Sequence, residues 1–185
     1  MSTATALAMT GGEPAVPPGA HRPWPQIDAS DRAAVERVLD GGELWGPNAP
    51  EVTALAEEWA AYVERRHCVV VNSGTAALHC ALAAAEVGPG DEVVVPAFGF
   101  AATPMAVVHQ GATPVFCDID PALHALDPRK AEALVGPRTK AIVPVHAHGL
   151  PADMDELELL ARRHGLALIE DASQAHGARY RGRPA

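Results

Sequence analysis

The stretch LALIEDASQAHG, residues 166–177, places a cluster of polar side chains directly after a short apolar run. The run Leu166–Ile169 is typical of a buried β-strand. Asp171 follows it almost at once, and Gln174 comes three residues later. Because ligands of open α/β sheets bind at the carboxyl ends of the strands, the stretch predicts a binding site there. An acid in this place can also cap the next turn, so the stretch alone leaves both interpretations open.

Similar apolar runs precede this stretch, and helical patterns separate them. The predicted strands lie at residues 68–71, 92–96, 113–118, 141–145 and 166–170. The predicted helices between them lie at residues 75–86, 101–110, 128–134 and 153–164. Strands that alternate with helices of this length indicate an α/β fold, in which helices flank a mostly parallel sheet.

The amino-terminal part has a different character. Residues 1–23 are rich in Ala, Gly and Pro and show no periodicity, so we expect a flexible arm there and one domain over residues 24–185. Two helices are predicted at residues 28–39 and 51–64, with a turn around Trp45 between them.

The composition excludes several classes of protein. The 185 residues carry a net charge of −9, which argues against a nucleic-acid partner. No apolar run approaches the roughly 18 residues that a membrane span requires. The three cysteines lie far apart without a CxxC pair and are typical of reduced, buried thiols, which predicts a cytoplasmic protein (Cys68, Cys80 and Cys117).

The turn Asn72–Thr75 joins the first predicted strand to a helix. The free backbone N–H groups at a helix start, beside the positive end of the helix dipole, can bind a phosphate group. Ser73, Gly74 and Thr75 are the candidates for this role. The turn matches neither the P-loop nor the Gly-x-Gly-x-x-Gly pattern, and a simple helix cap is the competing interpretation.

Asp171 needs a cationic partner if it is buried, because an uncompensated carboxylate is costly inside a protein. A protonated pyridine nitrogen would supply that charge, and Gln174 could bind a neighbouring ring oxygen. Together with a phosphate site, these residues predict a pocket for pyridoxal 5'-phosphate. Phe100 could stack on the flat ring, although packing in the core is the alternative. We expect no metal site, because no second group of metal-ligating residues stands at a suitable spacing from His146 and His148.

The sequence resembles the DegT/DnrJ/EryC1/StrS family of sugar and cyclitol aminotransferases, which are fold type I pyridoxal-phosphate enzymes. The resemblance covers nearly everything from Trp24 to the end of the chain, and the order and spacing of its motifs are specific. The matching stretches are Trp24–Pro25, Leu44–Pro47, Val71–Leu78, Val87–Val93, Pro96–Phe100, Gly111–Phe116, Pro137–Ile142, Pro144–His146, Pro151–Met154 and Glu170–Gly177.

The resemblance implies roles for individual residues. Gly74 and Thr75 would hold the cofactor phosphate, and Phe100 would stack on the pyridine ring. Asp171 would pair with the ring nitrogen, and Gln174 would face the ring hydroxyl. Trp45 would lie near the substrate pocket.

The chain departs from the family in lacking the lysine that binds the cofactor covalently. The family carries this lysine well beyond the Asp/Gln motif, whereas Lys130 and Lys140 are the only lysines of this chain, and both precede that motif. Lys130 is expected on an exposed helix and Lys140 at the start of a strand, away from the site. The family sheet also contains two later strands between the first strand and the acid-bearing strand, so residues 68–71 are expected to lack a neighbour. We therefore expect an incomplete fold type I large domain.

The resulting hypothesis is the amino-terminal half of a pyridoxal-phosphate aminotransferase that acts on a keto-sugar or keto-cyclitol. We expect an amino acid as the amino donor. We expect the lysine to come from a longer form of the protein or from a second chain in a homo- or hetero-oligomer. Two alternatives stay open: half of a sugar dehydratase that uses the same cofactor, and a non-catalytic scaffold or regulatory subunit of a full-length homologue. The exact substrate does not follow from the sequence.

Overall fold

The computed structural model describes residues 6–21 and 24–185, which belong to two compact units. The first unit ends at Ala49 and contains the one-turn helix η1 (Ala8–Thr10) and helix α1 (Ala29–Gly41). Asp28 begins α1 by accepting hydrogen bonds from the backbone N–H groups of Ser30 and Asp31, which confirms the helix predicted there. Of the predicted arm at residues 1–23, residues 1–5 and 22–23 lie outside the described part of the chain.

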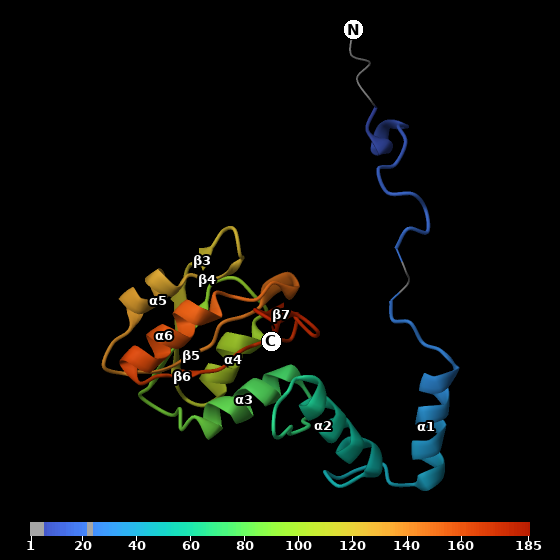
Figure 1. Cartoon of the computed structure of the whole chain (residues 1–185), viewed down its shortest axis with the longest axis horizontal. Coiled ribbons are helices and arrows are strands. Elements are labelled where there is room, and N and C mark those ends of the chain that lie inside the picture. The colour runs from blue at the N-terminus through green and yellow to red at the C-terminus, as the bar shows by residue number, and fades with distance from the viewer. Residues whose placement is uncertain (1–5, 22–23) are drawn as a thin grey trace. The chain divides into compact units, whose positions relative to one another are not determined.

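The second unit, Pro50–Ala185, is coloured from teal to red in Figure 1. It is built on a four-stranded parallel sheet in the order β2–β1–β5–β6. The strands are β1 (Glu92–Pro96), β2 (Thr113–Cys117), β5 (Thr139–Ile142) and β6 (Ala167–Leu168). β1 pairs with β2 on one side and with β5 on the other, and β5 pairs with β6. The mostly parallel sheet that the sequence predicts is therefore confirmed.

Helices cover both faces of this sheet. The helices of the unit are α2 (Pro50–Tyr62), α3 (Gly74–Ala84), α4 (Ala102–His109), α5 (Pro128–Leu134) and α6 (Met154–His164). Val93 and Val95 of β1 pack with side chains of α3 and α4, whereas Val94 packs with side chains of α5 and α6. Because successive strand residues face opposite sides, the valine run of β1 supplies both apolar layers.

Short elements connect the larger ones. Strands β3 (Ile119–Asp120) and β4 (Ala125–Leu126) form a hairpin after β2, and β7 (Arg179–Tyr180) and β8 (Arg183–Pro184) form another near the end of the chain. A one-turn helix, η2 (Ala147–Gly149), follows β5.

The strand predicted at residues 68–71 is wrong. This segment pairs with no strand of the described residues, and its Val69 is 79% exposed. A strand needs a neighbour to bond its backbone groups, and the sheet ends at β6 without reaching this segment. β6 itself therefore has one edge without a partner strand among the described residues.

The two strands that lead to the site are shorter than predicted. β5 begins two residues before the predicted run 141–145 and ends at Ile142. The run 166–170 forms a regular ladder only over β6. Pro144 lacks an N–H group and cannot donate to the ladder. Pairing nevertheless continues, because Val145 forms an isolated parallel bridge with Asp171.

Within residues 6–21 and 24–185, no helix has both the length and the apolar character that crossing a membrane would require.

Candidate functional site

The backbone of Asp171 is fixed at the carboxyl end of the sheet, where the sequence predicts it. Its N–H group donates to the carbonyl oxygen of Pro144 at 2.9 Å, and its own carbonyl oxygen accepts from the N–H group of His146 at 3.0 Å. These bonds continue the parallel pairing of β5 and β6 beyond the regular ladder. The acid is thus carried by the sheet, which gives it a defined position.

The side chain of Asp171 is buried, with 6% of its surface exposed. Oδ2 accepts a hydrogen bond from Oγ1 of Thr103 at 2.7 Å, and Oδ1 accepts from Oγ and the backbone N–H of Ser173 at 2.6 and 3.2 Å. Both partners are uncharged, and no cationic side chain of the described residues forms an ion pair with this carboxylate. A buried carboxylate with only neutral partners is well suited to a cationic ligand.

Helix α3 begins beside this acid. Oγ of Ser73 accepts from the backbone N–H of Ala76 at 3.1 Å, so Ser73 caps the helix. The N–H groups of Gly74 and Thr75 lie in the first turn, where a helix has no internal acceptors. A Cβ atom added to Gly74 would lie 3.7 Å from Oγ of Ser173, so the helix start and the Asp171 turn are in contact.

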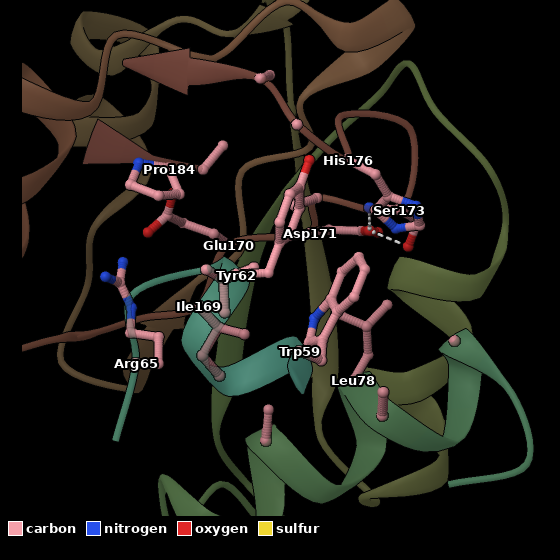
Figure 2. Close-up of a pocket in the computed structure, with 18 of the residues that line it drawn as sticks. Trp59, Tyr62, Arg65, Leu78, Ile169, Glu170, Asp171, Ser173, His176 and Pro184 are labelled. Carbon is pink, nitrogen blue, oxygen red and sulfur yellow. Dashed lines mark hydrogen bonds between the residues drawn. The ribbon is translucent and has the colours of Figure 1, made fainter. Parts of the chain in front are cut away.

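A cavity of about 590 Å³ lies between these two elements (Figure 2). Its lining includes Gly74, Asp171 and Ser173. Trp59 and Tyr62 of α2 extend into it. The ring of Trp59 contacts that of Tyr62 at a centroid distance of 5.4 Å and that of His176 at 5.2 Å. The structure therefore brings together two of the predicted cofactor residues, Gly74 and Asp171, in one cavity.

Phe100 lies outside this cavity, in a neighbouring hollow. It is 74% exposed and lines a second hollow of about 240 Å³, together with Thr103 and Val145. Thr103 also bonds Asp171, so the hollow that Phe100 lines borders a residue in contact with the acid. The exposed ring of Phe100 does not support the core-packing alternative.

The two remaining predicted site residues, Gln174 and Trp45, belong to different units of the chain. Oε1 of Gln174 accepts a hydrogen bond from the backbone N–H of His148 at 2.9 Å. The amide therefore connects the segment after β5 to the segment after β6, at the carboxyl edge of the sheet. Trp45 belongs to the first unit and is 88% exposed. Its predicted position near the site stays a prediction.

Neither lysine approaches the cavity. Nζ of Lys130, on α5, lies 3.3 Å from the carboxylate of Asp118. Lys140 lies near the amino end of β5, whereas the site lies beyond the carboxyl end of this strand. Neither Lys130 nor Lys140 lines the cavity.

The sequence alone does not indicate two of the contacts in the site. Thr103 reaches Asp171 across 68 positions of the chain, and His146 reaches Glu170 across 24. Nε2 of the buried His146 lies 3.0 Å from Oε2 of Glu170. The hydrogen bond to His146 is the main cause that lowers the pKa of the Glu170 carboxyl, although partial burial acts in the opposite direction. Only the folded sheet brings these residues together.

Comparison with curated proteins finds close relatives over most of this chain. The chain is 50% identical over 161 residues to the dTDP-3-amino-3,4,6-trideoxy-alpha-D-glucose transaminase of Streptomyces venezuelae, which covers 86% of this chain. It is 46% identical to the L-glutamine:2-deoxy-scyllo-inosose aminotransferase of Streptomyces lividus, which covers 97% of this chain. The match spans 42% and 43% of the lengths of these two relatives.

Solved structures show the same fold. The structure of 3-amino-5-hydroxybenzoic acid synthase superposes with a TM-score of 0.86 at 43% identity, over 89% of this chain and 43% of that one. The PLP form of the putative sugar aminotransferase Spr1654 from Streptococcus pneumoniae superposes with a TM-score of 0.80 at 31% identity, over 87% of this chain and 44% of that one. The predicted fold class, an incomplete fold type I large domain, is confirmed. Residues 25–185 match the sequence pattern of the DegT/DnrJ/EryC1/StrS aminotransferases, and the chain belongs to this family.

Proposed function

We propose that the chain forms the cofactor-binding part of a pyridoxal-phosphate aminotransferase. In this proposal the enzyme transfers an amino group from an amino acid to a keto-sugar or keto-cyclitol. The observation that carries the proposal is Asp171, a buried carboxylate without a cationic partner among the described residues, beside the start of helix α3. The names of the relatives, a sugar transaminase and a cyclitol aminotransferase, support the substrate class.

The residues present fit pyridoxal phosphate. A carboxylate has about four lone-pair sites, and the bonds from Thr103 and Ser173 leave room for one more donor on Asp171. Asp171 would accept from the protonated ring nitrogen, and the N–H groups of Gly74 and Thr75 would hold the phosphate. Phe100 would stack on the ring, and Gln174 would face its hydroxyl.

Asp171 has one chemical task in this scheme, which is to keep the proton on the ring nitrogen. When bound, the cofactor supplies an electron sink for the carbanion at the donor's α-carbon, and it does so best with its ring protonated. The neutral donors Thr103 and Ser173 hold both oxygens of the carboxylate in place. Trp45 would border the substrate.

The catalytic lysine would come from another segment or from a partner chain in a homo- or hetero-oligomer. Three observations support this proposal. Neither Lys130 nor Lys140 borders the cavity, and one edge of β6 pairs with no strand of the described residues. The cavity itself lies between Ile169, just after β6, and helix α3. A lysine-bearing segment that added strands at this edge would also pair the extended residues 68–71. We place the enzyme in the cytoplasm, where the free cysteines would stay reduced.

Co-expression with a lysine-bearing polypeptide tests this function. The polypeptide would be the remaining part of one of the relatives, and transfer of the amino group would be measured with a keto-sugar or keto-cyclitol acceptor. We expect activity only when both chains are present. Asp171→Asn should lower the rate on the order of 100-fold, as expected for a lost electrostatic contact at a reacting group.

Asp118→Asn is the matched control, since Asp118 is exposed and does not line the cavity. Full activity of the Asp171→Asn enzyme would contradict the proposal. The other outcome to distinguish is dehydration of the sugar instead of amino transfer, which would retain the cofactor site but change the reaction.

A further inference from the structure

His146 holds the peptide that carries Asp171. Its backbone N–H donates to the carbonyl oxygen of Asp171 at 3.0 Å, and Val145 forms the parallel bridge to the same residue. Nε2 of its imidazole lies 3.0 Å from Oε2 of Glu170, the residue immediately before Asp171. His146 therefore contacts both residues of the Glu170–Asp171 pair, one through its side chain and the other through its backbone.

The second ring nitrogen defines the state of the imidazole. Nδ1 of His146 accepts a hydrogen bond from the backbone N–H of Ala152 at 3.1 Å. A nitrogen that accepts carries no proton, so the ring proton lies on Nε2 and is donated to Glu170. His146 is completely buried, so water does not compete for either bond. Glu170, with a side chain 31% exposed, is the outer end of this chain of contacts.

We propose that His146 is a positioning residue, fixed as the Nε2–H tautomer, which holds Asp171 in place for the cofactor ring through Glu170. This inference rests on the proposed function, because it assigns Asp171 to the ring nitrogen. The two hydrogen bonds of the His146 ring have different roles. The bond to Ala152 anchors the loop that leads to α6, and the bond to Glu170 orients the acid.

Two substitutions remove these two hydrogen bonds one at a time. In His146→Gln the amide nitrogen takes the place of Nε2 and retains the donor to Glu170, but the acceptor for Ala152 is lost. In His146→Asn the amide oxygen takes the place of Nδ1 and retains the acceptor for Ala152, but the donor to Glu170 is lost. Both substitutions replace a buried ring by a side chain that packs less well, so each variant is the control for the loss of packing in the other.

The test measures the dissociation constant of the full chain for pyridoxine 5'-phosphate, which forms no covalent bond with an amine, and for benzyl phosphate, which lacks the ring nitrogen. We expect His146→Asn to weaken pyridoxine phosphate binding by about tenfold, the lower end for the loss of a supporting contact, and His146→Gln to retain most of the affinity. Benzyl phosphate binding should stay the same in both. In an Asp171→Ala background, His146→Asn should have no further effect, since the two residues act in series.

The outcomes separate this inference from the proposed function. Equal affinity of the unmodified chain for the two phosphates would contradict the cofactor proposal itself. A ring-dependent affinity that survives His146→Asn, or that falls equally in His146→Gln, would overturn the positioning role alone. The same holds if ¹H–¹⁵N spectra of the unmodified chain show the proton of His146 on Nδ1 instead of Nε2.

Discussion

At the scale of single residues, the site depends on how one buried charge is held. Asp171 receives hydrogen bonds from Thr103 and Ser173, and both donors are neutral. Such bonds orient the carboxylate without neutralising it, so its charge remains available to a cationic ring. The bond from Thr103 also connects the start of α4 to the carboxyl end of the sheet.

Removing this hydroxyl should destabilise the protein. Thr103→Val retains the shape of the side chain but leaves Oδ2 of Asp171 without its donor, and the expected loss is about 1–3 kcal/mol of unfolding free energy. Urea unfolding measures it, with Thr53→Val on the exposed face of α2 as the control. A Thr103→Val midpoint equal to that of the control would show that the bond does not hold the acid.

The pair of His146 and Glu170 predicts a pH-dependent contribution to stability. The folded pKa of the Glu170 carboxyl lies below its usual value, mainly because of the hydrogen bond from His146. The ionised form therefore stabilises the fold above the usual value, and this contribution is lost as the pH falls through the lowered pKa.

Glu170→Gln tests this, because the variant has no carboxyl group to titrate. The difference in unfolding free energy between the unmodified chain and the variant should be constant near neutral pH and should shrink below about pH 4.5. Chemical unfolding at a series of pH values measures the difference. A difference that stays constant from neutral to acidic pH would contradict the hydrogen bond between His146 and the ionised Glu170.

Sequence reasoning finds the acid and the turn that we propose for the phosphate, but not the contacts that hold them. Asp171 and Gly74 are visible because each follows a recognisable strand or precedes a recognisable helix. Thr103 and Glu170 give no such signal, because their partners are far away in the sequence and meet them only in the folded sheet. For the same reason, His146 could be considered only as a metal ligand before its surroundings were known.

At the scale of elements, helix α3 connects fold and function. Ser73 caps the helix and so places the first-turn N–H groups beside the Asp171 turn. Two of the predicted elements, β1 and α5, have the predicted bounds. The apolar run at residues 68–71 resembles that of β1 but forms no strand, because a strand depends on a partner and a helix does not.

Changing the cap should separate the stability of α3 from phosphate binding. Ser73→Ala should cost about 1 kcal/mol of unfolding free energy, because the N–H of Ala76 loses its acceptor. Ser73→Asp supplies a new acceptor and should restore stability, but its negative charge should weaken phosphate binding. Thermal unfolding and pyridoxine phosphate titration measure the two effects. Equal phosphate affinity in the Asp and Ala variants would place the phosphate elsewhere.

At the scale of the whole molecule, the second unit has an open side. In the part of the chain that the structure describes, its sheet ends at β6, and residues 68–71 pair with no strand. The cavity lies against the residues that follow β6. Unpaired strand edges favour association with another segment. The free edge, the cavity and the position of the two lysines therefore support a single account, in which a lysine-bearing segment completes both the sheet and the site.

The most direct test of this account is an absorbance scan of the purified chain with pyridoxal phosphate, alone and together with the lysine-bearing polypeptide. We expect a band at about 410–430 nm, typical of the lysine-bound cofactor, only when both chains are present. The band should survive gel filtration and disappear with borohydride. The same band from the chain alone would mean that Lys130 or Lys140 binds the cofactor and would contradict the account. No band in either case would favour a non-catalytic scaffold.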